Sequence, residues 1–142
     1  PPRAAIAGAG RLPWCVMSQP PTARPVRESL LAAARDLADA AAGRHPAHDA
    51  VRGAALALEF HLDTLARGLA RGQIEARLRS RAEAIQADLN RALEKLWAVE
   101  AALRQGGVES ARLAELATTV RALGETEIDL VLEEFRSLGA LD

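Results

Sequence analysis

The chain has 142 residues, a formal net charge of −1 and a single cysteine, Cys15. This length suits one domain that folds around its own core without a metal or a disulfide. The nearly balanced charge argues against a basic protein that coats nucleic acid, and one cysteine cannot form a disulfide within the chain.

Apolar residues make up 49% of the chain, but aromatic residues only 3%. The apolar fraction is mostly Ala and Leu, which favour helix, so we expect an all-α protein. No run of about 18 apolar residues occurs, which predicts no membrane span. We expect a cytoplasmic protein. Lys95 is the single lysine among 18 basic residues, a bias typical of GC-rich bacterial coding sequences.

Residues 1–25 hold six of the seven prolines. Because proline cannot continue a helix, this segment is predicted to be an extended N-terminal arm. The only methionine is Met17. Residues 1–16 therefore have three possible origins: a native extension, translated upstream sequence, or a remnant of cloning.

The first two predicted helices carry apolar residues that alternate four- and three-residue steps. The first helix covers about 26–42 and ends at Gly43. A second helix begins after Pro46, and we expect the chain to break at Gly68–Gly72. The stripes consist of Val26, Leu30, Ala33 and Leu37, and of Val51, Ala55, Leu58, Leu62, Leu65 and Leu69.

The longest stripe predicts a central helix over about 73–105. Its members are Leu78, Ala82, Ile85, Leu89, Ala92, Leu96, Val99 and Leu103. A fourth helix ends near Gly124. Thr126 and Asp129 have the spacing of a capping box, which predicts the start of a last helix. Ile128, Leu132 and Phe135 are predicted to face inward, with Leu138 as a further candidate at the end of this helix. We expect an antiparallel helical bundle of about five helices, with residues 26–142 as one domain.

No catalytic or cofactor-binding signature accompanies these stripes, so we expect no cofactor and favour a non-enzymatic protein. The stripes hold more apolar surface than one slim bundle needs, which indicates protein–protein association, first of all as a homodimer. Any other protein partner is unknown. The predicted interface lies on the long helix, at Leu89, Leu93, Leu96, Trp97 and Leu103.

A second hypothesis is a metal-dependent helical hydrolase. Glu59 and Asp63 lie on one side of a helix, where their like charges repel unless a cation intervenes. His61 points away from both in a regular helix, so the site would need an acid from the last helix, such as Glu133.

The third hypothesis is a site for an anion or nucleic acid. Five arginines lie around the glycine-rich junction: Arg67, Arg71, Arg77, Arg79 and Arg81. Guanidinium groups bind phosphates and carboxylates, but no aromatic residue lies among them, so base stacking is not supported. A solvated or ion-paired face is the simpler interpretation.

Overall fold

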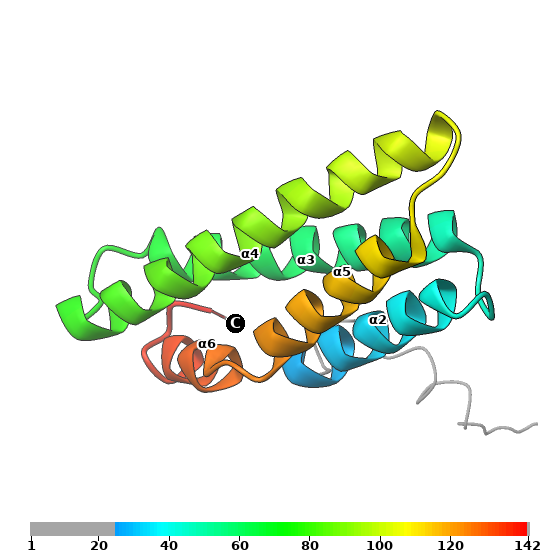
Figure 1. Cartoon of the computed structure of the whole chain (residues 1–142). Coiled ribbons are helices and arrows are strands. Elements are labelled where there is room, and N and C mark those ends of the chain that lie inside the picture. Colours follow the sequence, from blue (N-terminus) through cyan, green and yellow to red (C-terminus); the bar gives the residue numbers. More distant parts are fainter. Residues whose placement is uncertain (1–24, 142) are drawn as a thin grey trace, which may run out of the picture.

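A computed structural model describes residues 25–141, which are helical with short connections and no strand. The helices, numbered as in Figure 1, are α2 (Val26–Ala41), α3 (Ala47–Leu69), α4 (Ala76–Arg104), α5 (Ser110–Gly124) and α6 (Ile128–Ser137). The all-α prediction is therefore confirmed. The predicted arm lies outside the described residues apart from Pro25.

Four helices, α2 to α5, form the body of the bundle, and successive helices run in opposite directions (Figure 1). The closest packing is between α2 and α5 and between α3 and α4. α6 lies across the end where α2 begins and contacts α2, α3 and α4. Within residues 25–141, no helix is both long and apolar enough to cross a membrane.

The predicted stripes form the core. The side chains with the largest buried volumes come from every helix: Leu30, Leu37, Val51, Leu58, Leu65, Leu89, Leu96, Val99, Val120, Ile128, Leu132 and Phe135. Small residues permit the close approach of α2 and α5. A Cβ added at Gly124 would lie 3.2 Å from the Cβ of Leu30, so a larger residue there would push the two helices apart.

The chain breaks between α3 and α4, as predicted, but Gly68 is not part of the break. Gly68 is helical and lies against the ring of Phe135 from α6. The turn itself covers residues 70–75, so α4 begins at Ala76 rather than Gln73. Neither Gly68 nor Gly72 has a positive φ. Gly68 is needed for helix packing rather than for backbone freedom.

The predicted capping box at the start of α6 is wrong. Thr126 Oγ1 donates to the carbonyl of Leu123, and α6 begins at Ile128 without a side-chain cap. The carboxylate of Asp129 instead accepts hydrogen bonds from the backbone N–H groups of Val26 (2.7 Å) and Arg27 (2.9 Å). Asp129 therefore caps α2, which follows Pro25 and has no cap of its own.

The inward position predicted for Leu138 is also wrong. This residue follows the last turn of α6 and its side chain is 57% exposed. The buried side of α6 ends one turn earlier, at Phe135.

Alanine substitutions at the two glycines should separate their roles. Gly68→Ala places a methyl group 2.2 Å from Cδ2 of the Phe135 ring, which is too close for two carbon atoms. The variant should lower the free energy of unfolding by about 1–3 kcal/mol, the usual cost of overpacking. Gly72→Ala meets no atom within 4 Å and should leave stability unchanged or slightly raised. Urea unfolding of both variants measures the difference; equal effects would contradict the contact with Phe135.

Removal of the Asp129 carboxylate should expose its role as a cap. Asp129→Ala leaves two backbone donors of α2 without a partner and should cost about 1–2 kcal/mol of stability. Glu133→Ala, an exposed change on the same helix, is the control and should cost less than about 0.5 kcal/mol. Thermal unfolding of both variants measures the costs, and a harmless Asp129→Ala would contradict the assignment.

Candidate functional site

The outer side of the α3–α4 pair carries partly exposed apolar residues next to a tryptophan. Trp97 Nε1 on α4 donates a hydrogen bond to Glu59 Oε2 on α3 at 3.2 Å. Leu93 lies one turn before Trp97, and both are partly buried. On α3, Leu56 lies one turn before Glu59 and is 48% exposed. Phe60 instead packs edge-on against His61, with the ring centroids 5.6 Å apart. We call Leu56, Leu93 and Trp97 the α3–α4 face.

The residues predicted to form an interface fall into two groups. Leu89 and Leu96 have no exposed area, because their side chains fill the core of the single chain. Leu93, Trp97 and Leu103 keep some exposed surface. Leu103 follows Trp97 by six residues, about 240° around the helix, so it points in another direction. Only Leu93 and Trp97 belong to the α3–α4 face.

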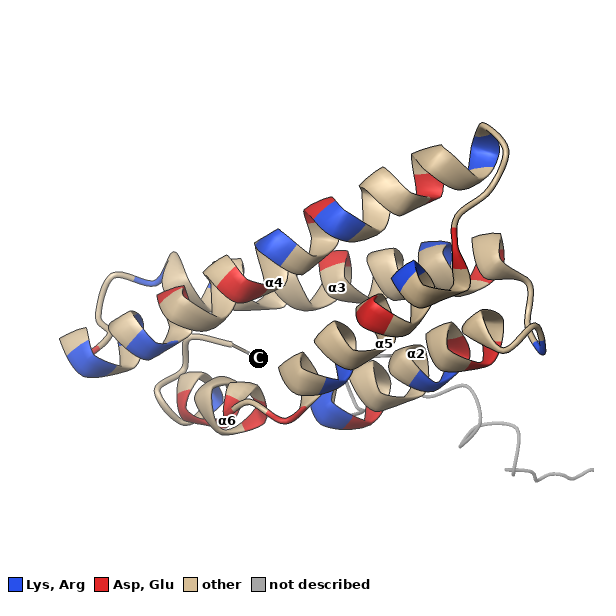
Figure 2. Cartoon of the chain, viewed as in Figure 1, with Lys and Arg blue, Asp and Glu red and all other residues tan. Residues whose placement is uncertain are grey.

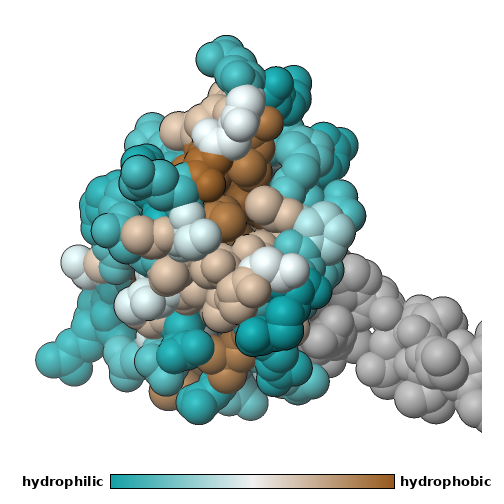
Figure 3. Space-filling view, turned by 45° about the vertical axis from the view of Figure 1, so that its right-hand side comes forward, coloured by the Kyte–Doolittle hydropathy of each residue, from teal (hydrophilic) through white to brown (hydrophobic). Residues whose placement is uncertain are grey.

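Leu103 lies at the other end of α4, close to the connection to α5. Figure 3 shows an apolar strip that descends from the tip of this connection between hydrophilic flanks. Leu103 and Val108, on either side of the connection, are both packed against the core. Leu103 and Val108 are both partly buried, so each exposes a smaller fraction of its side chain than Leu56 does.

The acidic residues of the metal hypothesis have other partners. Glu59 accepts the indole hydrogen bond, and Asp63 Oδ2 lies 3.2 Å from Arg67 Nε. Glu133 is exposed on α6. No group of three or more His, Cys, Asp or Glu side chains in the described chain is placed to hold a metal ion. The described residues thus offer no ready metal centre around Glu59.

His61 takes part in a buried polar contact that the sequence did not predict. Its Nε2 lies 3.0 Å from Ser29 Oγ on α2, and the side chain is 3% exposed. Burial lowers the pKa of His61, and the nearby carboxylate of Asp129 opposes this shift. Because these residues come from α2, α3 and α6, no local spacing in the sequence could reveal the contact.

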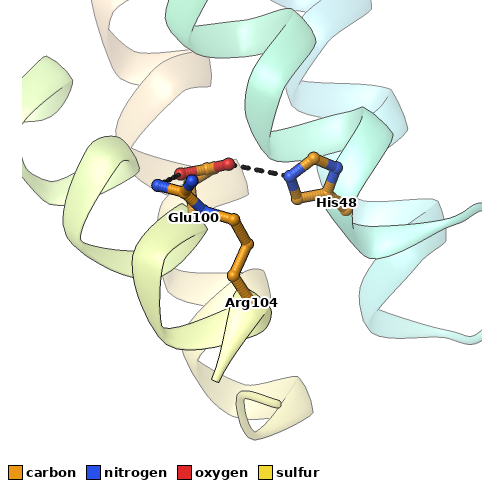
Figure 4. A network of polar contacts seen from close by, with 3 residues as sticks. All are labelled: His48, Glu100 and Arg104. Carbon is orange, nitrogen blue, oxygen red and sulfur yellow. Dashed lines mark hydrogen bonds and ion pairs between the residues drawn. The ribbon is translucent and has the colours of Figure 1, made fainter. Parts of the chain in front are cut away.

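A second polar cluster joins the first turn of α3 to the last turns of α4 (Figure 4). Glu100 is 4% exposed; its Oε2 accepts a hydrogen bond from His48 Nε2 at 2.8 Å. Its Oε1 lies 3.0 Å from Arg104 Nη2. The hydrogen bond from His48 lowers the pKa of Glu100, with burial acting against it. This buried carboxylate is satisfied on both sides, as a core charge must be.

The five predicted arginines do not converge on one point. Arg67 pairs with Asp63, and Arg81 pairs with Glu127 at 3.4 Å. Arg79 approaches the carbonyl oxygen of Arg71 at 3.5 Å. Arg77 lines an open hollow of about 580 Å³ between α4 and α6, together with Gln73, Glu75, Leu78, Arg81, Glu134, Ser137 and Leu138. Glutamates therefore offset the arginines that line this hollow.

The chain matches no protein-family model, no curated protein and no solved structure.

The pKa values of His61 and Glu100 predict that the fold weakens in acid. Below pH 6.5 the unfolded His61 binds a proton that the buried side chain resists, so stability falls as pH falls from there toward the lowered pKa. Glu100 stabilises the fold above pH 4.5, and this contribution is lost as pH falls through its lowered pKa.

Chemical denaturation between pH 7 and 5 isolates the histidine contribution. The fall in the free energy of unfolding between pH 7 and pH 5 should be smaller in His61→Asn than in the parent protein, because the variant has no imidazole at this position to protonate. His45→Asn, at a partly exposed site before α3, should decline like the parent. An equal decline in all three proteins would contradict a role for His61.

Proposed function

We propose that this protein is a non-enzymatic helical association module that forms a homodimer through the α3–α4 face. The observation that carries the proposal is the position of Trp97. Its indole is fixed to Glu59 by a hydrogen bond while part of its surface stays accessible. A tryptophan held in one orientation loses little conformational entropy when a partner covers it.

The surroundings of Trp97 suit a protein interface. Leu56 is 48% exposed, although a leucine gains free energy from burial. Leu93 extends the apolar surface along α4, Glu59 lies within the face where it binds Trp97, and Asp63, one turn further along α3, places a charge at the edge. An apolar centre with a charged rim is the usual anatomy of a protein–protein interface. We propose a second copy as the partner because two-fold pairing is the commonest form of association.

The two other hypotheses have less support. A metal-dependent hydrolase would have to take Glu59 from Trp97 and Asp63 from Arg67 before either carboxylate could bind a cation. An anion or nucleic-acid site has Arg77 in an open hollow, but Glu75 and Glu134 line the same hollow. The two glutamates offset the charges of Arg77 and Arg81, so the hollow offers a phosphate little net attraction.

Light scattering coupled to size-exclusion chromatography tests the proposal. The parent protein should elute as a dimer at tens of micromolar. Leu56→Glu places a charge in the centre of the α3–α4 face and should weaken the dimer at least about tenfold, as burial of an unpaired charge costs more than 1.4 kcal/mol. Because Leu56 is half exposed, the fold should survive, and circular dichroism checks that it does.

Leu130→Glu is the matched control, since Leu130 is 55% exposed but lies on α6. This variant should remain as dimeric as the parent. A parent protein that is monomeric at tens of micromolar would overturn the homodimer, and equal losses in both variants would move the interface away from the α3–α4 face.

A further inference from the structure

α6 exposes the most accessible large apolar side chains of the described residues. Leu130 is 55% exposed and Leu138 is 57% exposed. They lie eight residues apart with Glu134 midway, so all three lie along one side of the helix and its C-terminal extension. We call Leu130, Glu134 and Leu138 the α6 face. Two half-exposed leucines on one side of a helix form a surface that a partner segment can cover.

A concave site lies directly beside this face. Leu138 borders the hollow of about 580 Å³ between α4 and α6, and Leu78 is also part of its lining. Leu78 itself is 5% exposed. A hollow of this volume accommodates a large apolar side chain, with arginine and glutamate side chains around it.

The surroundings of the α6 face are acidic. Between residues 125 and 137 the chain has one basic residue, Arg136, and five acidic ones: Glu125, Glu127, Asp129, Glu133 and Glu134. Figure 2 shows acidic positions along α6 and its approach. Arg81 on α4 offsets part of this charge through Glu127 and Glu134. A basic segment with apolar side chains is therefore the complementary partner.

The chain itself contains such a segment. Residues 1–24 include Arg3, Arg11 and Arg24 and no acidic residue. Apolar residues stand at alternate positions within this stretch, at Leu12, Trp14 and Val16. The segment also joins the described structure at the right place. Asp129, in the first turn of α6, holds the N–H groups of Val26 and Arg27.

The segment is long enough to reach the hollow. Trp14 and Pro25 lie eleven positions apart, a distance of up to about 36 Å when the chain is extended. The α6 face needs less, because nine residues of helix from Asp129 to Leu138 rise about 14 Å. A tethered segment acts at a high effective concentration, and the prolines at 13, 20, 21 and 25 reduce the entropy lost on binding.

We propose that residues 12–16 bind the α6 face of their own chain, with Trp14 in the hollow between α4 and α6. Leu12 and Val16 cover the exposed leucines, and the arginines of the segment face the acidic residues of α6.

Tryptophan fluorescence tests the proposal directly, because the chain has only two tryptophans. In the full-length Trp97→Phe variant, Trp14 is the single reporter. Its emission should be shifted to the blue, and acrylamide should quench it several-fold less than in a free peptide of residues 1–24. Adding Leu130→Asp and Leu138→Asp should restore the quenching of the free peptide without loss of helix content.

Leu56→Asp is the control and should leave Trp14 protected. Quenching of the parent reporter as strong as that of the free peptide would overturn the proposal. Protection that grows with protein concentration would also overturn it, since the segment would then bind a second copy. If Trp97→Phe fails to fold, hydrogen exchange of the parent protein is compared with that of the single variant Trp14→Ser. Loss of Trp14 should speed the exchange of the α6 amides. Unchanged exchange would reject the proposal.

Discussion

The Asp129 carboxylate connects the first and the last helix of the described chain. α2 follows a proline and starts without a capping side chain, so its first N–H groups need an acceptor from elsewhere. Asp129 provides that acceptor from α6, 102 residues further along the chain than Arg27. α6 has only 10 residues and would be unstable alone in water. α6 therefore supplies the cap that α2 lacks, and its contact with α2 helps to keep the short α6 folded.

One further contact holds α6 in place, and another joins α2 to α3 beside it. The ring of Phe135 packs against the bare backbone at Gly68, which brings α6 close to α3. Nearby, His61 meets Ser29, so α2 and α3 are joined beside the same carboxylate. Small changes at Gly68 or Asp129 would move α6 and with it one wall of the hollow next to Leu138.

The sequence was sufficient to predict the helices but not the contacts between them. Four- and three-residue steps depend only on helix periodicity, which is why most residues of the stripes are buried. Ala33, Leu62, Leu69 and Leu103 are only partly buried. The capping box failed because Thr126 and Asp129 both found other partners. Local spacing cannot show that a carboxylate will serve a distant helix.

The same limit applies to the candidate site. The sequence singled out Trp97 and Leu93 beside the main stripe, and both lie on the α3–α4 face. It also included Leu89 and Leu96, which are buried, because a stripe alone does not separate residues that face a neighbour in the same chain from those that face another molecule. Glu59 was selected as a metal ligand, yet its partner is an indole 38 residues away.

The two proposed contacts differ in how they respond to concentration, and this difference makes them compatible. A contact within one chain forms at any dilution, whereas a dimer forms by mass action. An uncovered α6 face would be a second exposed apolar surface able to bind other molecules, on a different helix from the α3–α4 face. Two different surfaces that both bind other copies can build open chains instead of closed dimers. The proposed binding of residues 12–16 over Leu130 and Leu138 would remove this route and leave association to the proposed interface on the α3–α4 face.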